Sequence, residues 1–447
     1  MTLLSRIVTT LEKLNSKISL DYKQRLTESL VFLLVINGLF GSLIFGANWW
    51  MLEVLIGSSL AFCFFAILVK KEFIEKCSYK RSYFFCFEII GLSFFINSFY
   101  FGVLSYFAIG FLFSVVLPML HMAMCCEGYE KIFLRIVKGI LCSYIFFLIV
   151  SFIFGPRLSY HYSSLFMNPN ILGYYLIIVS SSVIWLLYKN RLNRRHTLVL
   201  SGLLSSILIF CFFSASRTGL FSIIMQIMCV LILAVFLNFK KVTWESVIDF
   251  AKNLLSLAIV FVSTLVVIFT LFVFVKPSIN EEFMQSVILG KHYLVKGIEE
   301  SGINVDSFTS GRVGIWKSYL ENVRFLGHAT EERYIVSGPR IYNSTNAHNV
   351  YLQMSYSAGI VCGFTMMALV ALAVKDVFVG LWMAVKRRKI SIELLFVSLC
   401  VSGFIFPSMT SSGYMPFVYL PATLFYFAIS YLAIEKGNAH AKNINDC

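Results

Sequence analysis

The chain alternates long apolar runs with short polar gaps. About twelve of these runs approach the ~20 residues that a helix needs to cross the hydrocarbon core of a bilayer. They fall near residues 28–46, 50–69, 83–99, 102–124, 139–154, 170–188, 197–213, 218–238, 254–275, 349–374, 392–407 and 415–434. The pattern predicts an all-α, polytopic integral membrane protein with about 12 transmembrane helices and one large extracytoplasmic loop.

Composition supports this class, and the distribution of basic residues predicts how the chain is oriented in the membrane. The chain is 58% hydrophobic and 13% charged, with a mean hydropathy of +0.81, which excludes a soluble globular protein. A net charge of +14 could indicate a nucleic-acid partner. However, Lys and Arg cluster in every second gap between the runs, as cytoplasmic loops do. The basic charge therefore indicates contact with anionic membrane lipid, with no nucleic acid and with both termini cytoplasmic.

The same pattern divides the chain into segments. We expect a cytoplasmic amphipathic N-terminal segment at 1–27, transmembrane helices 1–9 within 28–276, a large periplasmic loop at 277–348, transmembrane helices 10–12 within 349–434, and a cytoplasmic tail at 435–447. Inside the loop, apolar residues at steps of three and four predict a helix over 312–324. Apolar residues between Val377 and Val385, followed by Lys386 to Lys389, predict a separate interfacial helix.

Arg217 is the only charged residue between Thr197 and Asn238, a stretch long enough to cross a bilayer twice. A charge in hydrocarbon costs ~2.5–3.5 kcal/mol on insertion scales, so such a residue is a candidate for function. The alternative is an anchoring arginine at a tight turn whose side chain reaches the headgroups. The predicted topology places this turn on the outer face, where anchoring arginines are uncommon, and favours function.

Arg312 and His348 are predicted on the same face. Arg312 starts the predicted loop helix, although it could be a solvated surface residue. His348 lies where the loop re-enters the membrane, close to the free N–H groups of a helix start; the alternative is a polar boundary residue. Arginine pairs bidentately with phosphate, and histidine can take a proton from a hydroxyl. The three residues therefore suit a reaction of a diphosphate lipid. The outer loops hold no Asp-x-Asp pair, so we expect neither a metal nor a cofactor.

Four short motifs resemble the bacterial family of O-antigen polymerases and ligases. Ser216 to Gly219 is similar to the family's arginine-glycine motif. Gly311-Arg312 with Trp316 is similar to its loop signature, and Asn346 to Leu352 to its histidine motif. Phe166 to Asn170, with Gly173 beyond, is similar to an earlier motif at the outer edge. The resemblance covers about residues 165–363.

This resemblance implies a metal-independent membrane glycosyltransferase of the GT-C-like class in the bacterial cytoplasmic (inner) membrane. Its substrate would be an undecaprenyl-diphosphate-linked oligosaccharide, and a flippase and a chain-length regulator would be partner proteins. Arg217 and Arg312 would bind the diphosphate, and His348 would activate or orient the acceptor hydroxyl. Further candidate substrate-binding residues are Asn349, Tyr351, Arg340, Asn168 and Asn170. For Asn168 and Asn170 the sequence Asn-Pro-Asn favours a helix cap instead.

Three functions fit these features. The first is a polymerase that joins lipid-linked repeat units into O-antigen or capsule. The second is a ligase that moves the finished glycan to a lipid A-core or protein acceptor. The third is a flippase or exporter of lipid-linked sugars. A transporter would place charges in mid-span and commonly shows internal repeats. The chain shows no internal repeat, and Arg217 lies at the edge of a span, so we favour an enzyme, and the polymerase first.

Overall fold

A computed structural model of the chain describes most of its membrane-embedded part. The described residues are 3–40, 50–70, 77–154, 157–158, 162–164, 166, 168–190, 193–238, 256, 258–268, 270, 312–329, 334–337, 340–343 and 346–436. The predicted loop before residue 312 and the tail after residue 436 lie outside them.

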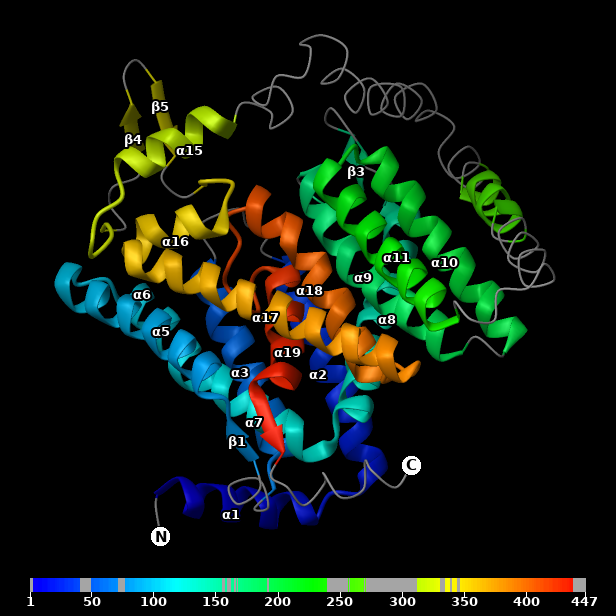
Figure 1. The fold of residues 1–447 in the computed structure, drawn as a ribbon, viewed down its shortest axis with the longest axis horizontal. Coiled ribbons are helices and arrows are strands. Elements are labelled where there is room, and N and C mark those ends of the chain that lie inside the picture. Colours follow the sequence, from blue (N-terminus) through cyan, green and yellow to red (C-terminus); the bar gives the residue numbers. More distant parts are fainter. Residues whose placement is uncertain are drawn as a thin grey trace. The chain divides into compact units, whose positions relative to one another are not determined.

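These residues are predominantly helical (Figure 1). The helices are α1 (Leu3–Ser16), α2 (Leu20–Phe40), α3 (Trp50–Leu68), α5 (Arg81–Phe101), α6 (Leu104–Phe111), α7 (Leu117–Glu127), α8 (Tyr129–Phe154), α9 (Pro169–Lys189), α10 (Arg194–Phe213), α11 (Arg217–Asn238), α15 (Arg312–Glu321), α16 (Val350–Ala358), α17 (Ile360–Arg387), α18 (Ile392–Thr410) and α19 (Leu420–Ala433). A π-helical turn (Leu112–Val116) joins α6 to α7. The described part also contains the helix Ala258–Ile268 and three antiparallel strand pairs: β1 (Cys77–Tyr79) with β6 (Ile434–Lys436), β2 (Arg157–Leu158) with β3 (Tyr162–Ser164), and β4 (Tyr334–Ser337) with β5 (Arg340–Asn343).

Eight helical stretches in the described part are long and apolar enough to cross a bilayer. They are Arg81–Phe101, Leu104–Cys125, Tyr129–Ser151, Pro169–Lys189, Arg194–Phe213, Arg217–Leu237, Ile360–Arg387 and Ile392–Thr410. Three shorter apolar helices accompany them, at Val54–Leu68, Ala258–Ile268 and Leu420–Ala433. The prediction of a polytopic helical membrane protein is confirmed. The count of twelve spans, the cytoplasmic termini and the GT-C-like class stay predictions.

Two details differ from the sequence prediction. The single span expected at 349–374 is wrong, because the chain breaks at Gly359 between α16 and α17. Gly359 has a φ of +97°, and a Cβ atom there would lie 2.0 Å from the carbonyl oxygen of Phe325. The separate helix expected between Val377 and Val385 is also wrong, because α17 continues without interruption to Arg387. The helix expected over 312–324 is confirmed as α15, which ends earlier, at Glu321.

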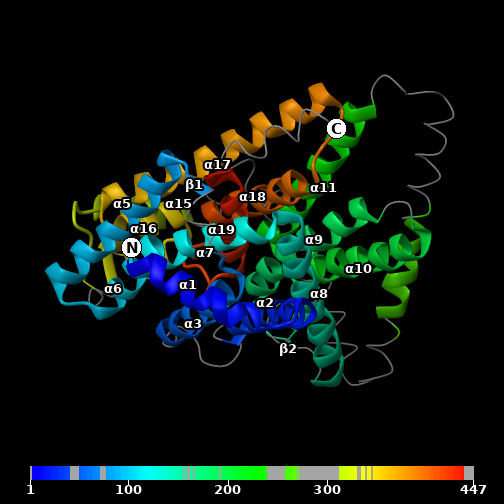
Figure 2. The same ribbon diagram turned by 90° about the horizontal axis from the view of Figure 1, so that it is seen from below.

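The chain forms two compact units. The first contains Met1–Gly139, Arg312–Val377 and Ser408–Cys447, and the second contains Ile140–Gly311 and Phe378–Pro407. In the first unit, α5 and α6 lie side by side (Figures 1 and 2), and α7 packs against α3 and α19. Aromatic rings fill its core: Phe113 meets Tyr426 edge-on at 5.5 Å and stacks on Phe94 at 6.4 Å.

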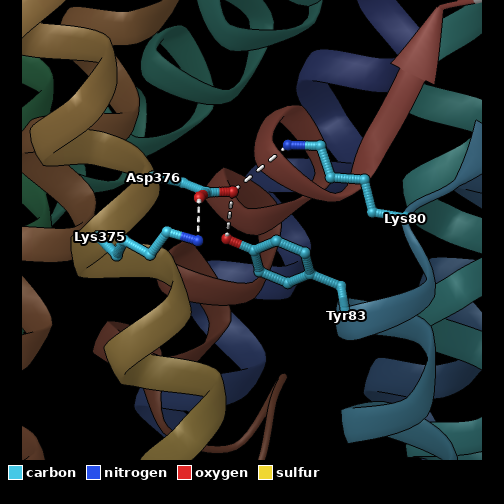
Figure 3. Close-up of polar contacts among 4 residues, drawn as sticks. All are labelled: Lys80, Tyr83, Lys375 and Asp376. Atoms are coloured by element: carbon cyan, nitrogen blue, oxygen red, sulfur yellow. Dashed lines mark hydrogen bonds and ion pairs between the residues drawn. The ribbon is translucent and has the colours of Figure 1, made fainter.

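A charged contact joins α17 to the start of α5 within the first unit. Asp376 accepts hydrogen bonds from the Lys80 ammonium at 3.3 Å and from the Tyr83 hydroxyl at 3.2 Å (Figure 3). The Lys375 ammonium lies 4.0 Å from the other carboxylate oxygen. An acid in an apolar helix needs such partners, because an uncompensated charge in a membrane protein is costly.

The second unit is organised around a buried amide. The Gln226 side chain of α11 donates to the Ser181 hydroxyl of α9 at 2.7 Å and to the carbonyl oxygen of Leu399 in α18 at 3.2 Å. It also accepts a hydrogen bond from Ser180. Since buried polar groups stabilise only when they are hydrogen-bonded, this network fixes how α11, which begins at Arg217, packs on α9 and α18.

Candidate functional site

Arg217 is the first residue of α11 and follows a three-residue turn after α10. Ala215 in this turn adopts a left-handed backbone conformation with a φ of 51°. The Ser216 hydroxyl caps the new helix by accepting a hydrogen bond from the Gly219 amide at 3.3 Å. Arg217 itself is half-buried. The turn therefore presents a guanidinium beside the first N–H groups of a long helix, an arrangement that favours anions.

Two glycines hold this turn against α9. A Cβ atom on Gly173 would lie 2.1 Å from the Ser216 hydroxyl oxygen, and one on Gly219 would lie 2.9 Å from the Cα atom of Gly173. The backbones can approach this closely only because neither position carries a side chain. The motif around Gly173 and the motif around Arg217 are thus neighbours in the second unit.

Asn168 and Asn170 begin α9 in the same unit. The Asn168 side chain accepts a hydrogen bond from the Asn170 amide at 2.8 Å, and Pro169 occupies the first helical turn. This is the geometry of an N-cap followed by proline. The cap uses one side-chain oxygen of Asn168, which is otherwise exposed.

Arg312 and Tyr319 lie on α15 in the first unit. Arg312 is half-buried at the start of the helix, and Tyr319 is fully buried two turns later. Tyr319 packs with Ile335, Ala347 and Tyr356 in one apolar cluster. In Figure 1, α15 lies beside α16, and α15 also contacts strand β4. The residues before and after His348 are therefore packed against the helix that carries Arg312.

His348 occupies a tight turn immediately before α16. Its backbone is left-handed, with a φ of 49°. The next residue, Asn349, is the N-cap of α16 and accepts hydrogen bonds from the amides of Tyr351 at 3.0 Å and Leu352 at 3.1 Å. Histidine is among the few non-glycine residues that enter the left-handed region with any frequency. The turn places the half-buried imidazole beside the helix start.

Arg312 and His348 interact electrostatically. Burial, and then the positive charge of Arg312, lower the pKa of His348 from 6.5 to about 4. Both effects disfavour the imidazolium form. Near neutral pH, His348 is consequently a neutral imidazole next to a permanent cation. Such a pair can bind an anion at the guanidinium and accept a hydrogen bond or a proton at the imidazole.

The other residues predicted to bind substrate lie in several different elements. Asn349 caps α16, and the Tyr351 hydroxyl lies 2.9 Å from the Ser408 hydroxyl in the first unit. Arg340 is in β5, where its backbone pairs with Ser337. The structure thus brings Arg312 and His348 together in one unit, and places Arg217, Asn168 and Asn170 in the other.

Sequence reasoning missed two residues that contact the turn around His348. The Asn346 amide donates to the Tyr319 hydroxyl at 3.2 Å, and the Ala347 amide donates to the Gln353 side chain at 3.0 Å. For Gln353, the signal is its place one turn into the helix that follows the motif. For Tyr319, its place on the face of the predicted loop helix shared with Arg312 is the available signal. In the part of the chain that the structure describes, no three His, Cys, Asp or Glu side chains cluster to hold a metal ion.

Comparison with known proteins adds one finding. A family model described as O-antigen ligase matches residues 202–367, which include the turn at Arg217, the helix at Arg312 and the turn at His348. This region is similar to the O-antigen ligase family. The resemblance drawn from the motifs is confirmed. No curated protein and no solved structure shows significant similarity to the chain.

The matched O-antigen ligase region starts within α10 and ends within α17. It therefore includes parts of both compact units. The helices α1 to α9 and α18 to α19 lie outside the match, so the family relationship rests on the middle of the chain. Within that middle part, Arg217, Arg312 and His348 each begin or directly precede a helix.

Proposed function

We propose that this protein is a membrane glycosyltransferase that joins undecaprenyl-diphosphate-linked oligosaccharide repeat units into O-antigen or capsular polysaccharide. The observation that carries the proposal is the Arg312–His348 pair, a permanent cation beside a neutral imidazole on a braced turn. Its position inside the region matched to the O-antigen ligase family supports the same class of reaction. We place the site at the outer face of the cytoplasmic membrane, as the distribution of basic residues predicts.

The proposed transfer uses each group for one task. The oxygen of an acceptor hydroxyl attacks the anomeric carbon of the lipid-linked sugar. The bond between that carbon and the diphosphate oxygen breaks, and its electron pair leaves with the diphosphate. Arg312 binds the departing diphosphate through its guanidinium. His348 accepts the proton of the attacking hydroxyl.

Substrate binding would adjust the basicity of His348. In the free protein the Arg312 charge helps to hold the pKa of His348 near 4, which makes the imidazole a weak base. A diphosphate bound at Arg312 brings negative charge close to the imidazole and raises its pKa. The base would thus become stronger when the substrate that needs it is bound.

Arg217, which lies in the second unit, is also proposed to bind diphosphate. This assignment rests on its sequence motif, on its place at the start of α11 and on the cost of a charge between two apolar runs. Asn349 and Tyr351 follow His348 on the same segment, and Arg340 precedes it; these residues are proposed to contact the sugar or diphosphate. Asn168 and Asn170 are proposed to shape the start of α9 beside the Arg217 turn.

The ligase is the second candidate, because the matched family is described as O-antigen ligase. Polymerase and ligase share the donor and the chemistry, and differ in the acceptor. Deletion of the gene separates them. A surface glycan capped with single repeat units supports the polymerase, whereas long lipid-linked chains that fail to reach the surface acceptor support the ligase.

The transfer reaction is tested with purified protein in detergent and undecaprenyl-diphosphate-linked oligosaccharides. We expect new glycosidic bonds, detected as longer lipid-linked chains by mass spectrometry, and loss of product in Arg312→Gln, His348→Ala and Arg217→Ala. Lys317→Gln is the matched control, because Lys317 is an exposed cation on α15 that lies 3.9 Å from Glu321. If no glycosidic bond forms in detergent, where transport has no meaning, both enzyme candidates fail and an exporter of lipid-linked sugars remains.

A further inference from the structure

The backbone of His348 is held in an unfavourable conformation by its neighbours. A left-handed residue other than glycine costs ~1–3 kcal/mol and persists only when surrounding contacts over-determine it. The Asn346 side chain accepts a hydrogen bond from the Ser412 hydroxyl at 3.0 Å, and the Ala347 amide donates to Gln353 at 3.0 Å. On the other side, Asn349 caps α16. Each residue flanking His348 is therefore anchored by a side chain.

One of these anchors comes from the helix that carries Arg312. The Asn346 amide donates to the Tyr319 hydroxyl at 3.2 Å, across 27 positions of sequence. Arg312 and Tyr319 are seven residues apart on α15, which is about two helical turns or ~10 Å. They therefore project from nearly the same face of the helix. Tyr319 joins the arginine's helix directly to the histidine's turn.

Contacts between aromatic rings hold the Tyr319 side chain in place. The Tyr319 ring meets the Tyr356 ring edge-on, with centroids 5.1 Å apart. Tyr356 in turn stacks on the His328 ring at 3.8 Å, and the His328 Nδ1 atom lies 2.9 Å from the Tyr356 carbonyl oxygen. Tyr319, Tyr356 and His328 are all buried. A buried ring has little room to move, so its hydroxyl is a fixed point for the turn.

We propose that Tyr319 is a positioning residue that sets the separation between the Arg312 guanidinium and the His348 imidazole. Its hydroxyl fixes the backbone two residues before His348, and its own helix fixes Arg312. The proposal rests on the proposed function in so far as these two groups act together in glycosyl transfer. The separation itself is a property of the substrate-free protein and can be measured without any reaction.

The measurable consequence is electrostatic. In the described part of the chain, Arg312 on α15 is the charge that acts on His348. The phenols Tyr319 and Tyr356 pack beside the turn, and His328 stacks on Tyr356. Coulomb interaction weakens as two charges move apart. If Tyr319 is changed so that α15 is released from the turn, the effect of Arg312 on the imidazole must decline. The pKa of His348 must then rise above about 4 by the part that Arg312 causes, while the larger effect of burial keeps it below 6.5.

The test uses Tyr319→Phe in the purified full-length protein. Phenylalanine keeps the ring and removes the hydroxyl that accepts the hydrogen bond from the Asn346 amide. Diethyl pyrocarbonate modifies neutral imidazole, so the rate of modification of the peptide that contains His348, followed by mass spectrometry from pH 4 to 7.5, reports its protonation. We expect the rate in the unchanged protein to fall near pH 4 and the rate in Tyr319→Phe to fall at a clearly higher pH.

Tyr129→Phe is the matched control. The buried Tyr129 hydroxyl donates to the Ser430 carbonyl at 2.7 Å, so this change also removes one buried tyrosine hydrogen bond, but away from α15 and the His348 turn. We expect it to leave the modification profile of His348 unchanged. An unchanged profile in Tyr319→Phe, with the protein still folded by size-exclusion chromatography, overturns the proposal.

Turnover gives an independent second readout. We expect Tyr319→Phe to lower kcat by about tenfold to a hundredfold, as small misplacements of reacting groups do, and to change KM much less. A shifted His348 profile in a protein that makes no product from diphosphate donors supports the positioning role and removes the proposed function. A normal profile with normal turnover removes the positioning role and leaves the proposed function intact.

Discussion

Gly173 of α9 and Gly219 of α11 meet so closely that a Cβ atom on Gly219 would lie 2.9 Å from the Cα atom of Gly173. The same atom would lie 3.0 Å from the Cys211 sulfur. The Gly173 neighbour is backbone, so it cannot give way unless α9 separates from α11. This contact determines where the turn that carries Arg217 lies relative to the start of α9.

We therefore expect Gly219→Ala to destabilise the protein by ~1–3 kcal/mol, the usual cost of overpacking, and to lower product formation strongly. The measurements are detergent unfolding and chain elongation. Gly202→Ala is the matched control, because a Cβ atom at Gly202 in α10 would lie 3.9 Å from the Thr264 hydroxyl oxygen, its nearest neighbour among the residues that the structure describes. Alanine at this open helical position should be neutral or stabilising by up to ~1 kcal/mol. Equal effects of the two changes would mean that the close contact does not matter.

The Asp376 contact makes a different prediction. Asp376→Asn removes the charge that faces Lys80 and Lys375 and weakens the bond from Tyr83 (Figure 3). The Lys80 and Asp376 side chains are only 34% and 22% exposed, so we expect a loss of about 1–3 kcal/mol, between the values for exposed and for buried pairs. The measurement is the free energy of unfolding in detergent.

Asp21→Asn is the control for that experiment. Asp21 and Arg25 form an ion pair at 3.1 Å with side chains that are 74% and 76% exposed. Removing this pair should cost no more than ~0.5 kcal/mol. A double-mutant cycle of Asp376→Asn with Lys80→Gln then measures the coupling directly. A coupling energy near zero would show that Asp376 is stabilised by something other than Lys80.

The general class of the fold could be predicted from sequence, since long apolar runs have few alternatives to spanning a membrane. The break at Gly359 could not. A lone glycine in an apolar run is compatible with a continuous helix, and the distant Phe325 carbonyl that leaves no room for a Cβ atom at Gly359 leaves no signal in the local sequence. The continuation of α17 past Val377 was missed for a related reason, because an amphipathic segment before basic residues looks the same whether or not it is joined to a span.

The candidate site, too, could be predicted from the sequence only in part. Motif residues and topology placed Arg312 and His348 on one face, and the structure brings them within electrostatic reach. The contact between Tyr319 and Asn346 spans 27 positions and leaves no periodic signal in the sequence. Contacts of this kind depend on how α15 packs on α16, which hydropathy does not encode.

Asn97 holds the segment before Gly359 in place, and its replacement should loosen that segment selectively. Its side-chain amide donates to the carbonyl oxygens of Leu326 at 2.6 Å and Ser357 at 2.8 Å. Asn97→Asp replaces both donors with a carboxylate that faces two carbonyls, and unsatisfied buried groups cost ~1–3 kcal/mol each. We expect faster hydrogen exchange at residues 325–328 and 357–359, measured by mass spectrometry, with unchanged exchange in α9 to α11. Uniformly faster exchange throughout the chain would contradict a local role.

The lowered pKa of His348 predicts how stability depends on pH. In the unfolded chain this histidine titrates near ~6.5, whereas in the folded protein its pKa is about 4. As the pH falls, the unfolded chain binds the proton first, so protonation favours unfolding between these two values. We expect the free energy of unfolding to decline over this window, and to decline less steeply in His348→Gln.

A variant at Arg312 tests the same pH dependence of stability. Arg312→Gln removes the charge that helps to hold the imidazole neutral, so the pKa of His348 in the folded protein should rise. The pH range over which stability declines should then be narrower, because its lower limit is this folded-state pKa. Lys317→Gln removes an exposed cation from the same helix and should leave the window unchanged. The measurement is denaturant unfolding in detergent at several pH values from 7.5 to 4.5, compared between variants so that the titration of other groups cancels. Parallel curves for the unchanged protein and His348→Gln would show that His348 is not held neutral, and the proposed proton acceptor would then need to be a different residue.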